Sequence, residues 1–306
     1  MPVRKRKEIQ KMLFKIKLMN KIGLLDIDGH NGFPNLALMK LSTYHRQQGD
    51  TVEWLNHFSR YDRVYKSKVF TFTPDDNHVI QADEVIKGGT GYKLYSDLFC
   101  DDTEPDYTIY PNIRHAYGFL TRGCPNRCPW CVVPKKEGSI KPYRDIETVL
   151  QGRKTAILMD NNVLASDHGI RQLEKISDMK CKVDFNQGLD SRLVTEEIAK
   201  LLSKIKWIRY IRFSCDSTEV VDPLIKAISR LNKYGISNYR IFVYLLVTDV
   251  TDANERCRIL KQLGVIPFAQ PYRDEYNTPR TVEQKRFARY VNRKEIFKSI
   301  DFEQYE

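Results

Sequence analysis

From residue 113 to residue 292, short apolar segments alternate regularly with longer segments whose apolar residues recur at helical spacing. The apolar segments predict strands at 115–121, 155–159, 182–185, 208–213, 239–247 and 266–269. The intervening segments predict helices at 145–150, 169–179, 195–204, 220–234, 253–263 and 282–292. Parallel strands that are joined by right-handed helical crossovers close, or partly close, into a barrel. The pattern therefore predicts an α/β domain of six βα units.

Residues 1–112 follow a different and shorter pattern. Apolar runs predict strands at 14–28, 51–55, 64–72 and 82–86, and a helical pattern spans 34–48. Strand, helix, strand is the order of a small Rossmann-like α/β unit. Residues 90–112 show no clear period and are predicted to be a connector. The expected domains are a Rossmann-like N-terminal domain with its connector (1–112), the βα domain (113–292) and a C-terminal tail (293–306).

Length and composition are those of a chain that can bury a substantial core. Hydrophobic residues make up 42% of the 306 residues, but no apolar run reaches the length needed to span a bilayer. The basic N-terminus is not followed by the apolar core of a signal peptide. Seven cysteines, three of them clustered, indicate intracellular metal chemistry rather than a disulfide framework. We therefore expect a cytoplasmic protein without a membrane partner.

The formal net charge of +11 favours a polyanionic partner such as RNA or DNA, although a lysine-rich surface explains it equally well. Lys135, Lys136, Lys141 and Arg144 closely follow the clustered cysteines, and a second basic stretch spans 280–293. Beside an active site such groups attract phosphates. Charge therefore leaves open whether this chain binds nucleic acid.

The clustered cysteines carry the strongest chemical signal. Cys124, Cys128 and Cys131 have the spacing C-x3-C-x2-C, and the prolines at positions 125 and 129 exclude a helix or a central strand, which predicts a shaped loop. A structural zinc site normally has four protein ligands, and so does an ordinary iron–sulfur centre. A four-iron cluster on three cysteines leaves one iron open to a small molecule, whereas a zinc site needs a remote fourth ligand, for which Cys100 or His115 is available.

The spacing, with Trp130 directly before the third cysteine, resembles the signature of the radical S-adenosylmethionine (SAM) enzymes. The resemblance implies a four-iron four-sulfur (4Fe-4S) cluster on Cys124, Cys128 and Cys131 whose open iron binds SAM. In the family, reductive cleavage of SAM yields methionine and a 5′-deoxyadenosyl radical that abstracts hydrogen from a substrate, with the electron supplied by a flavodoxin- or ferredoxin-type donor. The six βα units resemble the partial barrel of this family, so the expected fold is a partial (βα)6 TIM-like barrel after the Rossmann-like unit.

In α/β barrels the active site lies at the carboxyl ends of the strands. The resemblance implies that Asp160 and Asn161, which end the second strand, stand where the family has Gly-Gly-Glu to hold the SAM amino group, since both accept hydrogen bonds from an ammonium. Gln187 ends the third strand. Arg192 lies in a segment similar to one in tRNA-modifying members, where an arginine pairs with the SAM carboxylate. A surface charge beside a helix is the alternative for Arg192.

Polar residues on the remaining strands extend this predicted site. Ser214 and Asp216 end the fourth strand and can bond the ribose hydroxyls, and Asp216 can also cap the following helix. Tyr244 on the fifth strand and Gln270 at the end of the sixth are candidates for the adenine side or the substrate, with packing inside the barrel as the alternative. Because the cysteine loop follows the first strand, the predicted cofactor site draws on all six strands.

The N-terminal unit resembles a shortened form of the cobalamin-binding domain that precedes some radical SAM cores. The family motif Asp-x-His-x-x-Gly, Ser-x-Leu or Ser-x-Val, and Gly-Gly has counterparts at residues 28–32, 67–69 and 88–89. The first glycine comes one residue early and the unit is short, so we expect a relic or a substrate-facing domain without bound cobalamin, and His30 as a polar turn residue.

Two hypotheses follow for the function. The first is a radical SAM enzyme that acts on an unidentified substrate, with nucleic acid or a nucleotide-linked molecule as the first candidate and a peptide or small metabolite as the next. A methylthiotransferase of the usual kind is disfavoured, because those enzymes carry a second three-cysteine site in an N-terminal domain and only Cys100 precedes the motif here. The second hypothesis is a zinc-stabilised nucleic-acid-binding module without catalysis. The scattered cysteines are predicted to be buried thiols, at positions 100, 181, 215 and 257.

Overall fold

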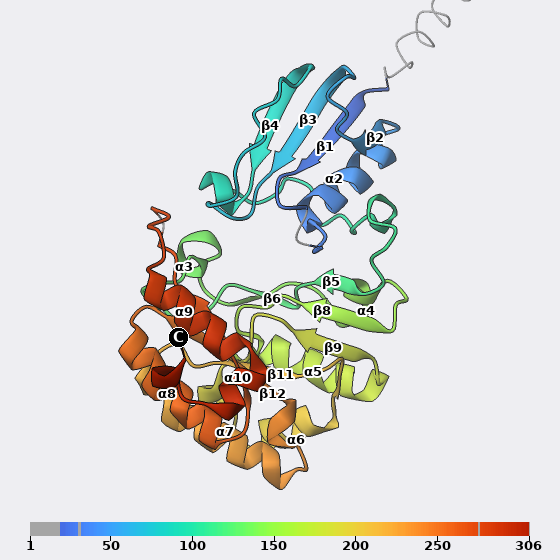
Figure 1. Cartoon of the computed structure of the whole chain (residues 1–306). Coiled ribbons are helices and arrows are strands. Elements are labelled where there is room, and N and C mark those ends of the chain that lie inside the picture. Colours follow the sequence, from blue (N-terminus) through green and yellow to red (C-terminus); the bar gives the residue numbers. More distant parts are fainter. Residues whose placement is uncertain (1–18, 30–31, 275, 306) are drawn as a thin grey trace, which may run out of the picture. The chain divides into compact units, whose positions relative to one another are not determined.

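The computed structural model describes residues 19–29, 32–274 and 276–305 (Figure 1). The chain divides into two compact units, Met1–Ile113 and Arg114–Glu306. The predicted strand at 14–28 lies partly outside the described residues, and His30 lies wholly outside them.

The first unit is a parallel sheet with one long helix. Its strand order is β2-β1-β3-β4, and every neighbouring pair is parallel. The elements are β1 (Lys21–Asp26), α2 (Leu36–Gln47), β2 (Thr51–Trp54), β3 (Tyr61–Ser67) and β4 (Ala82–Gly88). The Asn35 side chain caps α2 by accepting a hydrogen bond from the Leu38 N–H. This order confirms the predicted strand–helix–strand unit.

The third strand differs from its prediction, because it starts at Tyr61 and ends at Ser67 rather than spanning 64–72. The buried carboxylate of Asp28 accepts hydrogen bonds from the N–H of Val69 and the hydroxyl of Thr73, both at 2.5 Å. These bonds pull the segment after Ser67 out of the ladder into a turn. Asp28 thus meets the segment that follows Ser67 at the carboxyl ends of β1 and β3, and the Lys68 N–H donates to the carbonyl of Gly88, at the end of β4, at 3.0 Å.

The predicted connector packs onto the first unit. A short 3-10 turn, Tyr107–Ile109, inserts two buried side chains into the core that α2 forms with β1 and β2. The Tyr110 hydroxyl donates to Asp26 Oδ2 at 2.7 Å at the carboxyl end of β1. Residues 90–112 therefore belong to the first unit, although their polarity pattern shows no period.

The second unit contains, in its described part, a four-stranded and a three-stranded parallel sheet, with orders β10-β9-β8-β5 and β11-β12-β13. The strands are β5 (Ala116–Gly118), β8 (Thr155–Leu158), β9 (Lys182–Phe185), β10 (Lys206–Trp207), β11 (Ile211–Ser214), β12 (Ile241–Val247) and β13 (Ile266–Pro271). The helices are α4 (Ile146–Leu150), α5 (Asp167–Met179), α6 (Glu196–Lys204), α7 (Val221–Lys233), α8 (Val250–Gln262), α9 (Val282–Asn292) and α10 (Lys294–Ser299). All six predicted βα units are present.

The predicted strand at 208–213 starts too early, because β11 begins only at Ile211, and a separate short strand, β10, ends at Trp207 just before the predicted stretch. β10 pairs with β9, and β11 pairs with β12. A single parallel bridge between Leu189 and Phe213 links the two sheets. The chain therefore changes its pairing partner within this stretch, which the apolar pattern alone does not reveal.

Alternation along the strands separates two faces of these sheets. One face packs under the helices and includes Ala156, Phe213 and Val243, all 0% exposed. The other face is less covered and carries Arg212, Phe242 and Tyr244. The predicted tail also docks, since Phe302 packs against Phe287 with ring centroids 4.9 Å apart.

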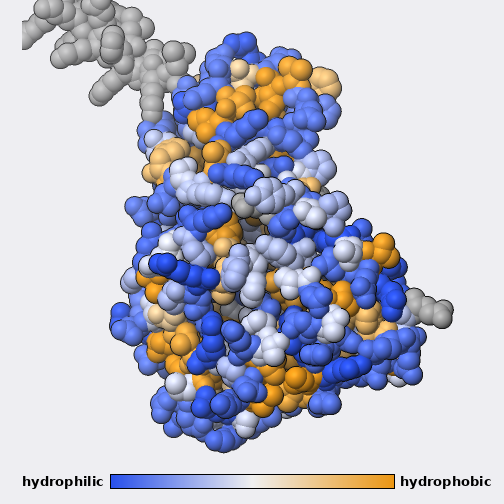
Figure 2. Space-filling model, turned by 90° about the vertical axis from the view of Figure 1, so that its left-hand side faces the viewer, coloured by the Kyte–Doolittle hydropathy of each residue, from blue (hydrophilic) through white to orange (hydrophobic). Residues whose placement is uncertain are grey.

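The surface mixes polar and apolar residues. Large side chains that remain exposed include Phe58 at 95% and Val79 at 81%. Figure 2 shows one face on which apolar patches are separated by hydrophilic residues. Among the described helices, none combines the length and the apolar character that crossing a bilayer requires.

Candidate functional site at the cysteine loop

The three cysteines lie in a segment whose two ends are joined by a short antiparallel hairpin; we call this segment, residues 123–140, the lobe. Thr121–Arg122 (β6) pairs antiparallel with Lys141–Pro142 (β7), directly after β5. Inside the lobe, the Cys124 N–H donates to the carbonyl oxygen of Gly138 at 3.1 Å. A single helical turn, Val133–Lys136 (α3), follows the last cysteine. The cysteine loop is therefore tethered at both ends, and the sequence pattern did not predict its hairpin.

Gly123 begins the cysteine loop in a conformation that a side chain would disturb. Its φ is +81°, and a Cβ would collide with the carbonyl oxygen of Ser139. Gly138, near the other end of the lobe, has a φ of +69°, but open space surrounds its Cβ position. This pair of glycines separates the effect of backbone strain from the effect of a collision.

We expect Gly123→Ala to lower the free energy of unfolding by about 1–3 kcal/mol, and Gly138→Ala to lower it by about 1 kcal/mol. Both variants strain the backbone, but only the first also displaces Ser139. Urea unfolding measures the stability. The iron and sulfide content after anaerobic reconstitution measures whether the cysteine loop can still bind a cluster. Equal losses in the two variants would show that contact with Ser139 does not matter.

Glu137 ties the base of the cysteine loop to the end of β8. Its side chain is 7% exposed and accepts from Arg122 Nη2 at 2.7 Å. Its second oxygen accepts from the Gly123 N–H at 2.9 Å and from Asn161 Nδ2 at 2.8 Å. Asn161 therefore lies beside the cysteine loop, where its amide group donates to Glu137, and its contact with the SAM amino group stays a prediction. Sequence reasoning missed Glu137, because nothing local marks it as an acceptor for residues 14 to 24 positions away.

Asp160 supports the segment between β5 and the hairpin. It is 1% exposed, and its carboxylate accepts from the N–H groups of Leu120 and Thr121 and from the Thr121 hydroxyl. Burial raises the pKa of this carboxyl to about 6. Both oxygens face protein donors, so the structure points to a positioning role for Asp160 rather than the predicted contact with the SAM amino group.

The raised pKa of Asp160 makes stability depend on pH. The carboxyl ionises near pH 4 in the unfolded chain and near pH 6 in the folded chain. Between these values the folded state holds the extra proton, so the contribution of this group to stability falls as the pH rises from about 4 to 6. We expect lowering the pH from 7 to 5 to stabilise the wild type by about 1 kcal/mol relative to Asp160→Asn. Urea unfolding of both proteins at the two pH values tests this, and identical pH responses would contradict it.

Asp190 is the centre of a hydrogen-bond network beside the cysteines. Its Oδ2 accepts from Asn126 Nδ2 at 3.0 Å and from Asn162 Nδ2 at 3.1 Å. Arg192 donates to both carboxylate oxygens at 2.8 Å. One carboxylate thus connects the cysteine loop, the end of β8 and the predicted arginine. Asp190 was not among the predicted site residues, although it lies within the segment that identified Arg192.

Asn162 is the residue of this network that contacts a cysteine. Its Nδ2 lies 3.7 Å from Cys124 Sγ, and the residue is only 2% exposed. Its Oδ1 is buried without a hydrogen-bond partner among the described residues. A buried acceptor without a partner is costly and indicates a donor that the protein chain does not supply. An ammonium group, such as that of an amino-acid ligand, meets this requirement.

The charged groups around the cysteines shift the pKa of the Cys128 thiol in opposite directions. Burial is the main cause that raises the pKa of Cys128, the guanidinium of Arg192 lowers it, and the carboxylates of Asp216 and Asp190 raise it further. Burial likewise raises the pKa of the Cys131 thiol, with Asp216 again adding to the effect. Without a bound metal these two thiols therefore stay protonated at neutral pH, and metal binding has to release their protons.

Ser214 and Asp216 lie at the carboxyl end of β11, on the same side of the molecule as the cysteine loop. Asp216 Oδ1 accepts from the Leu246 N–H at 3.2 Å, which links the ends of β11 and β12. Burial raises the pKa of the Asp216 carboxyl, and a hydrogen bond from Ser214 opposes that rise. The alternative role of Asp216 as a helix cap is wrong, because Ser217 and Val220 occupy the cap positions of the following helical segments.

Tyr244 belongs to an arginine and aromatic cluster on the less covered face of the sheets. Arg212 forms a bidentate ion pair with Asp184, with contacts of 2.6 and 2.7 Å, and also donates to the Tyr244 hydroxyl at 3.3 Å. Phe242 stacks on Tyr210 and on Phe268, with ring centroids 5.5 and 5.8 Å apart. Tyr244 thus has structural partners, and we name the group of Asp184, Tyr210, Arg212, Phe242, Tyr244 and Phe268 the aromatic cluster.

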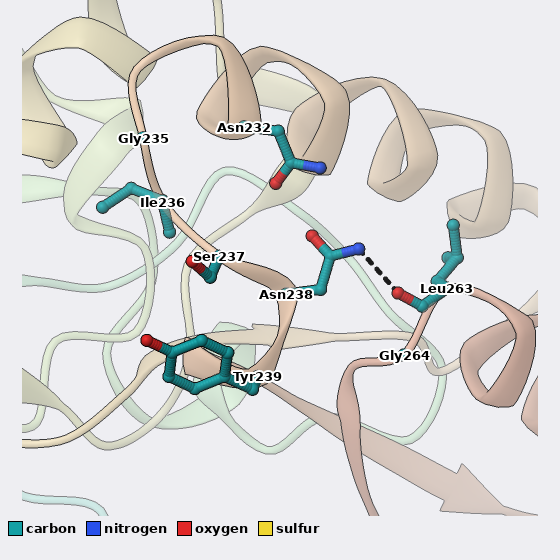
Figure 3. Close-up of a pocket in the computed structure, with 8 residues that line it drawn as sticks. All are labelled: Asn232, Gly235, Ile236, Ser237, Asn238, Tyr239, Leu263 and Gly264. Carbon is teal, nitrogen blue, oxygen red and sulfur yellow. Dashed lines mark hydrogen bonds between the residues drawn. The ribbon is translucent and has the colours of Figure 1, made fainter.

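The two predicted glutamines lie on the surface. Gln187 is exposed and donates to the neighbouring Asn186 side chain at 3.2 Å, and Gln270 is exposed near the end of β13. A surface pocket lies at the opposite, amino edge of β12 and β13 (Figure 3) and is lined by Asn232, Gly235, Ile236, Ser237, Asn238, Tyr239, Leu263 and Gly264. Its lining offers no carboxylate, imidazole or thiol, so the carboxyl edge remains the candidate site.

The geometry disfavours a closed zinc site. Tetrahedral zinc with Zn–S bonds of about 2.3 Å places its sulfurs about 3.8 Å apart. Among the described residues, the loop cysteines do not form a group whose ligand atoms all lie within 4.8 Å of one another. Cys100 is buried in the core of the first unit, and His115 bonds Thr155 Oγ1 at 2.8 Å at the amino end of β5. The thiol of Cys100 is enclosed in the core of its own unit and His115 is engaged at the amino end of β5, so neither offers a free fourth ligand for zinc. A cluster that binds each thiolate through a different iron suits wider spacing.

No protein-family model matches the chain. The chain is similar to ribosomal protein uS12 methylthiotransferase RimO from Caldanaerobacter subterraneus subsp. tengcongensis, with 28% identity over 166 residues, which covers 53% of this chain and 35% of that protein. The RimO of Clostridium perfringens is 29% identical over 130 residues, covering 40% and 25% of the two chains. The RimO of Clostridioides difficile is 27% identical over 133 residues, covering 42% and 27%.

The matched segments thus span about a third or less of the length of these relatives. RimO is a radical SAM methylthiotransferase. The similarity, together with three cysteines at radical SAM spacing beside the carboxyl ends of parallel strands, supports the assignment of this chain to the radical SAM superfamily.

Proposed function

We propose that this protein is a radical SAM enzyme whose 4Fe-4S cluster is held by Cys124, Cys128 and Cys131. The observation that carries the proposal is the network of Asn126, Asn162, Asp190 and Arg192 around these cysteines, which contains a buried acceptor without a donor among the residues that the structure describes. When bound and reduced, the cluster supplies the electron that cleaves SAM to methionine and a 5′-deoxyadenosyl radical. A flavodoxin- or ferredoxin-type protein is the proposed donor.

In this proposal the protein residues position SAM. Asn162 Oδ1 accepts a hydrogen bond from the SAM ammonium, a role that the sequence analysis had given to Asp160 and Asn161. Arg192 donates to Asp190 through Nε and Nη2, and its Nη1 is the donor that we assign to the SAM carboxylate. Ser214 and Asp216 bond the ribose hydroxyls. Tyr244 and Gln270 remain predictions for the adenine or substrate side, and Gln187 remains a predicted residue of the cofactor site at the end of the third strand.

We propose further that the two parallel sheets form one partial (βα)6 barrel, joined at the bridge between Leu189 and Phe213. The barrel interior is then the less covered face that carries the aromatic cluster. Its stacked rings and the guanidinium of Arg212 are groups on which nucleobases stack. Together with the net charge of +11, this cluster supports a nucleic-acid or nucleotide-linked substrate.

A protein substrate is the alternative, because the names of the relatives specify ribosomal protein uS12. We do not extend methylthio transfer to this chain. Methylthio transfer is named for the relatives, of whose length the matched segments cover about a third or less, and it is not part of this proposal.

Anaerobic reconstitution of the purified chain tests the proposal. We expect about four iron and four sulfide per chain, and formation of 5′-deoxyadenosine when the reduced protein is incubated with SAM. Zinc without sulfide, and no 5′-deoxyadenosine, would instead support the zinc-stabilised nucleic-acid-binding module.

A further inference from the structure

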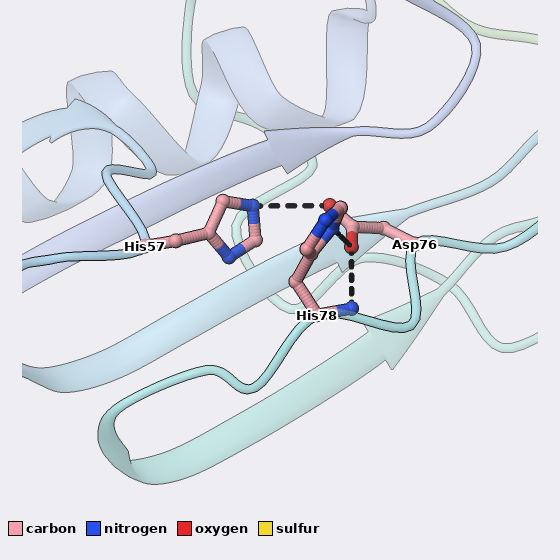
Figure 4. A group of neighbouring side chains, drawn as sticks. All are labelled: His57, Asp76 and His78. Atoms are coloured by element: carbon pink, nitrogen blue, oxygen red, sulfur yellow. Dashed lines mark hydrogen bonds and ion pairs between the residues drawn. The ribbon is translucent and has the colours of Figure 1, made fainter.

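Two histidines and an aspartate from separate loops of the first unit meet at one point (Figure 4). His57 lies in the loop between β2 and β3, and Asp76 and His78 lie in the loop between β3 and β4. His57 Nε2 is 3.1 Å from Asp76 Oδ2, and His78 Nδ1 is 2.7 Å from Asp76 Oδ1. The ligand atoms of all three side chains lie within 4.8 Å of one another. No local sequence pattern marks these three residues, because they come from two separate loops.

The aspartate at the centre of this group is held in place by its surroundings. The Asp76 carboxylate accepts from the backbone N–H of His78 at 2.8 Å, and the Asp76 carbonyl oxygen accepts from Lys66 Nζ at 2.6 Å. The Lys66 side chain is 5% exposed, and its Nζ forms an ion pair with Asp75 Oδ1 at 2.8 Å. The nearest buried cation therefore already has its own carboxylate, which leaves the charge of Asp76 for another positive group.

The imidazoles are oriented towards Asp76 but are not fully satisfied. Their ring centroids lie 4.9 Å apart. His57 Nδ1 is buried and has no hydrogen-bond partner among the described residues. The side chain of His78 is 78% exposed, whereas that of Asp76 is 19% exposed. The group is therefore open to solvent on the His78 side, from which an ion and its remaining water ligands can enter.

We propose that His57, Asp76 and His78 bind a divalent first-row metal ion, with Zn²⁺ as the preferred occupant. Two imidazole nitrogens and a carboxylate oxygen are ligands that zinc takes, at bonds of about 2.0–2.2 Å. In a tetrahedral site such ligands stand about 3.3 Å apart, and the observed contacts of 2.7 and 3.1 Å need only small side-chain rotations. On binding, the two N···O contacts are replaced by two metal–nitrogen bonds and one metal–oxygen bond. Each imidazole stays neutral, because the proton of the nitrogen that binds the metal moves, by exchange with water, to the other ring nitrogen.

The ion has a structural role in this inference, because it connects two loops that are otherwise joined by hydrogen bonds. The loop before β3 is held to the loop after it, at one end of the sheet of the first unit. The site contains no cysteine and is independent of the proposed SAM chemistry.

Cobalt titration of the full-length chain tests the site, because cobalt distinguishes it from the cysteine loop. Cobalt bound by thiolates shows intense sulfur-to-metal charge-transfer absorption, which cobalt bound by imidazole and carboxylate lacks. We expect one Co²⁺ to bind the wild type without that absorption. We expect His57→Ala, His78→Ala and Asp76→Asn each to weaken this binding by at least about tenfold. Replacing His168, which lies in the second unit, serves as the matched control and leaves the binding unchanged.

Thermal unfolding with Zn²⁺ gives a second readout that does not depend on catalysis. We expect Zn²⁺ to raise the Tm of the wild type and of His168→Ala, but not of His57→Ala. Circular dichroism of the metal-free variants checks that they fold. Cobalt that binds only with thiolate absorption, or cobalt binding that persists in both His57→Ala and His78→Ala, would overturn the inference.

Discussion

Cys128→Ala is expected to lower the formation of 5′-deoxyadenosine from SAM by at least about a thousandfold, to the rate without protein. The loop supplies three thiolates, and burial raises the pKa of the Cys128 thiol while the neighbouring guanidinium of Arg192 lowers it. Removing it leaves two ligands, too few for a cluster that already has an iron without a protein ligand. Product formation is measured by chromatography after anaerobic reconstitution and reduction, and the cluster by its visible absorption.

Cys181→Ala is the matched control for this variant. Cys181 is also a free thiol, but it is 7% exposed and lies directly before β9, in the apolar core. We expect Cys181→Ala to keep both the cluster and the activity. Undiminished 5′-deoxyadenosine from Cys128→Ala would refute the assignment of the cluster to this loop.

Arg256→Leu is expected to lower the free energy of unfolding by about 3–5 kcal/mol. Arg256 lies on α8 and is 1% exposed. Its guanidinium donates to the carbonyl of Cys215, to the carbonyl of Leu246 at 3.0 Å and to Asp252 at 2.5 Å. Leucine fills a similar volume but leaves two buried carbonyl groups at the ends of β11 and β12 without donors, and each such group carries a desolvation cost.

Arg258→Leu provides the comparison, since it changes the same residue type on the same helix. The side chain of Arg258 is 54% exposed and pairs with Glu303 at the surface, an arrangement that is worth at most about 1 kcal/mol. Urea unfolding of both variants measures the difference. Similar stabilities would show that the buried guanidinium is not required for the ends of β11 and β12.

Arg256 also bears on the candidate site. It bonds the carbonyl groups of Cys215 and Leu246, and these residues flank the contact between Asp216 and the Leu246 N–H. We therefore expect that a milder substitution, Arg256→Lys, weakens SAM binding more than Arg258→Lys does, because the carboxylate of Asp216 shifts with the strand ends. Equilibrium binding of SAM to the reconstituted proteins measures this effect.

Local patterns predicted much of the fold correctly. The last long helix has the predicted bounds, Val282–Asn292, and Thr195 caps α6 as expected. β9 also spans the predicted residues. These features depend on apolar spacing and on helix caps, which involve only a few neighbouring residues. They can therefore be predicted without knowledge of the rest of the chain.

Long-range contacts account for the predictions that failed. The β6–β7 hairpin pairs residues about 20 positions apart, and each strand has only two residues, too few to leave a polarity pattern. The late start of β11, relative to the predicted strand at 208–213, depends on the chain leaving its pairing with β9 after Trp207 and pairing with β12 from Ile211 onwards. Asp160 looked like a ligand because it ends a strand, but its oxygens face backbone groups about 40 positions earlier.

The sequence by itself determined the repeated βα order of the second unit and the presence of three cysteines at a spacing suited to one cluster, because both are matters of residue type and spacing. Only the tertiary structure decided which polar side chains surround those cysteines. Asn162 and Asp190 reach the cysteine loop because parallel strands bring their carboxyl ends together, and His57 meets Asp76 and His78 because two loops of one sheet end side by side. Such encounters depend on strand pairing and register, which residue spacing along the chain does not encode.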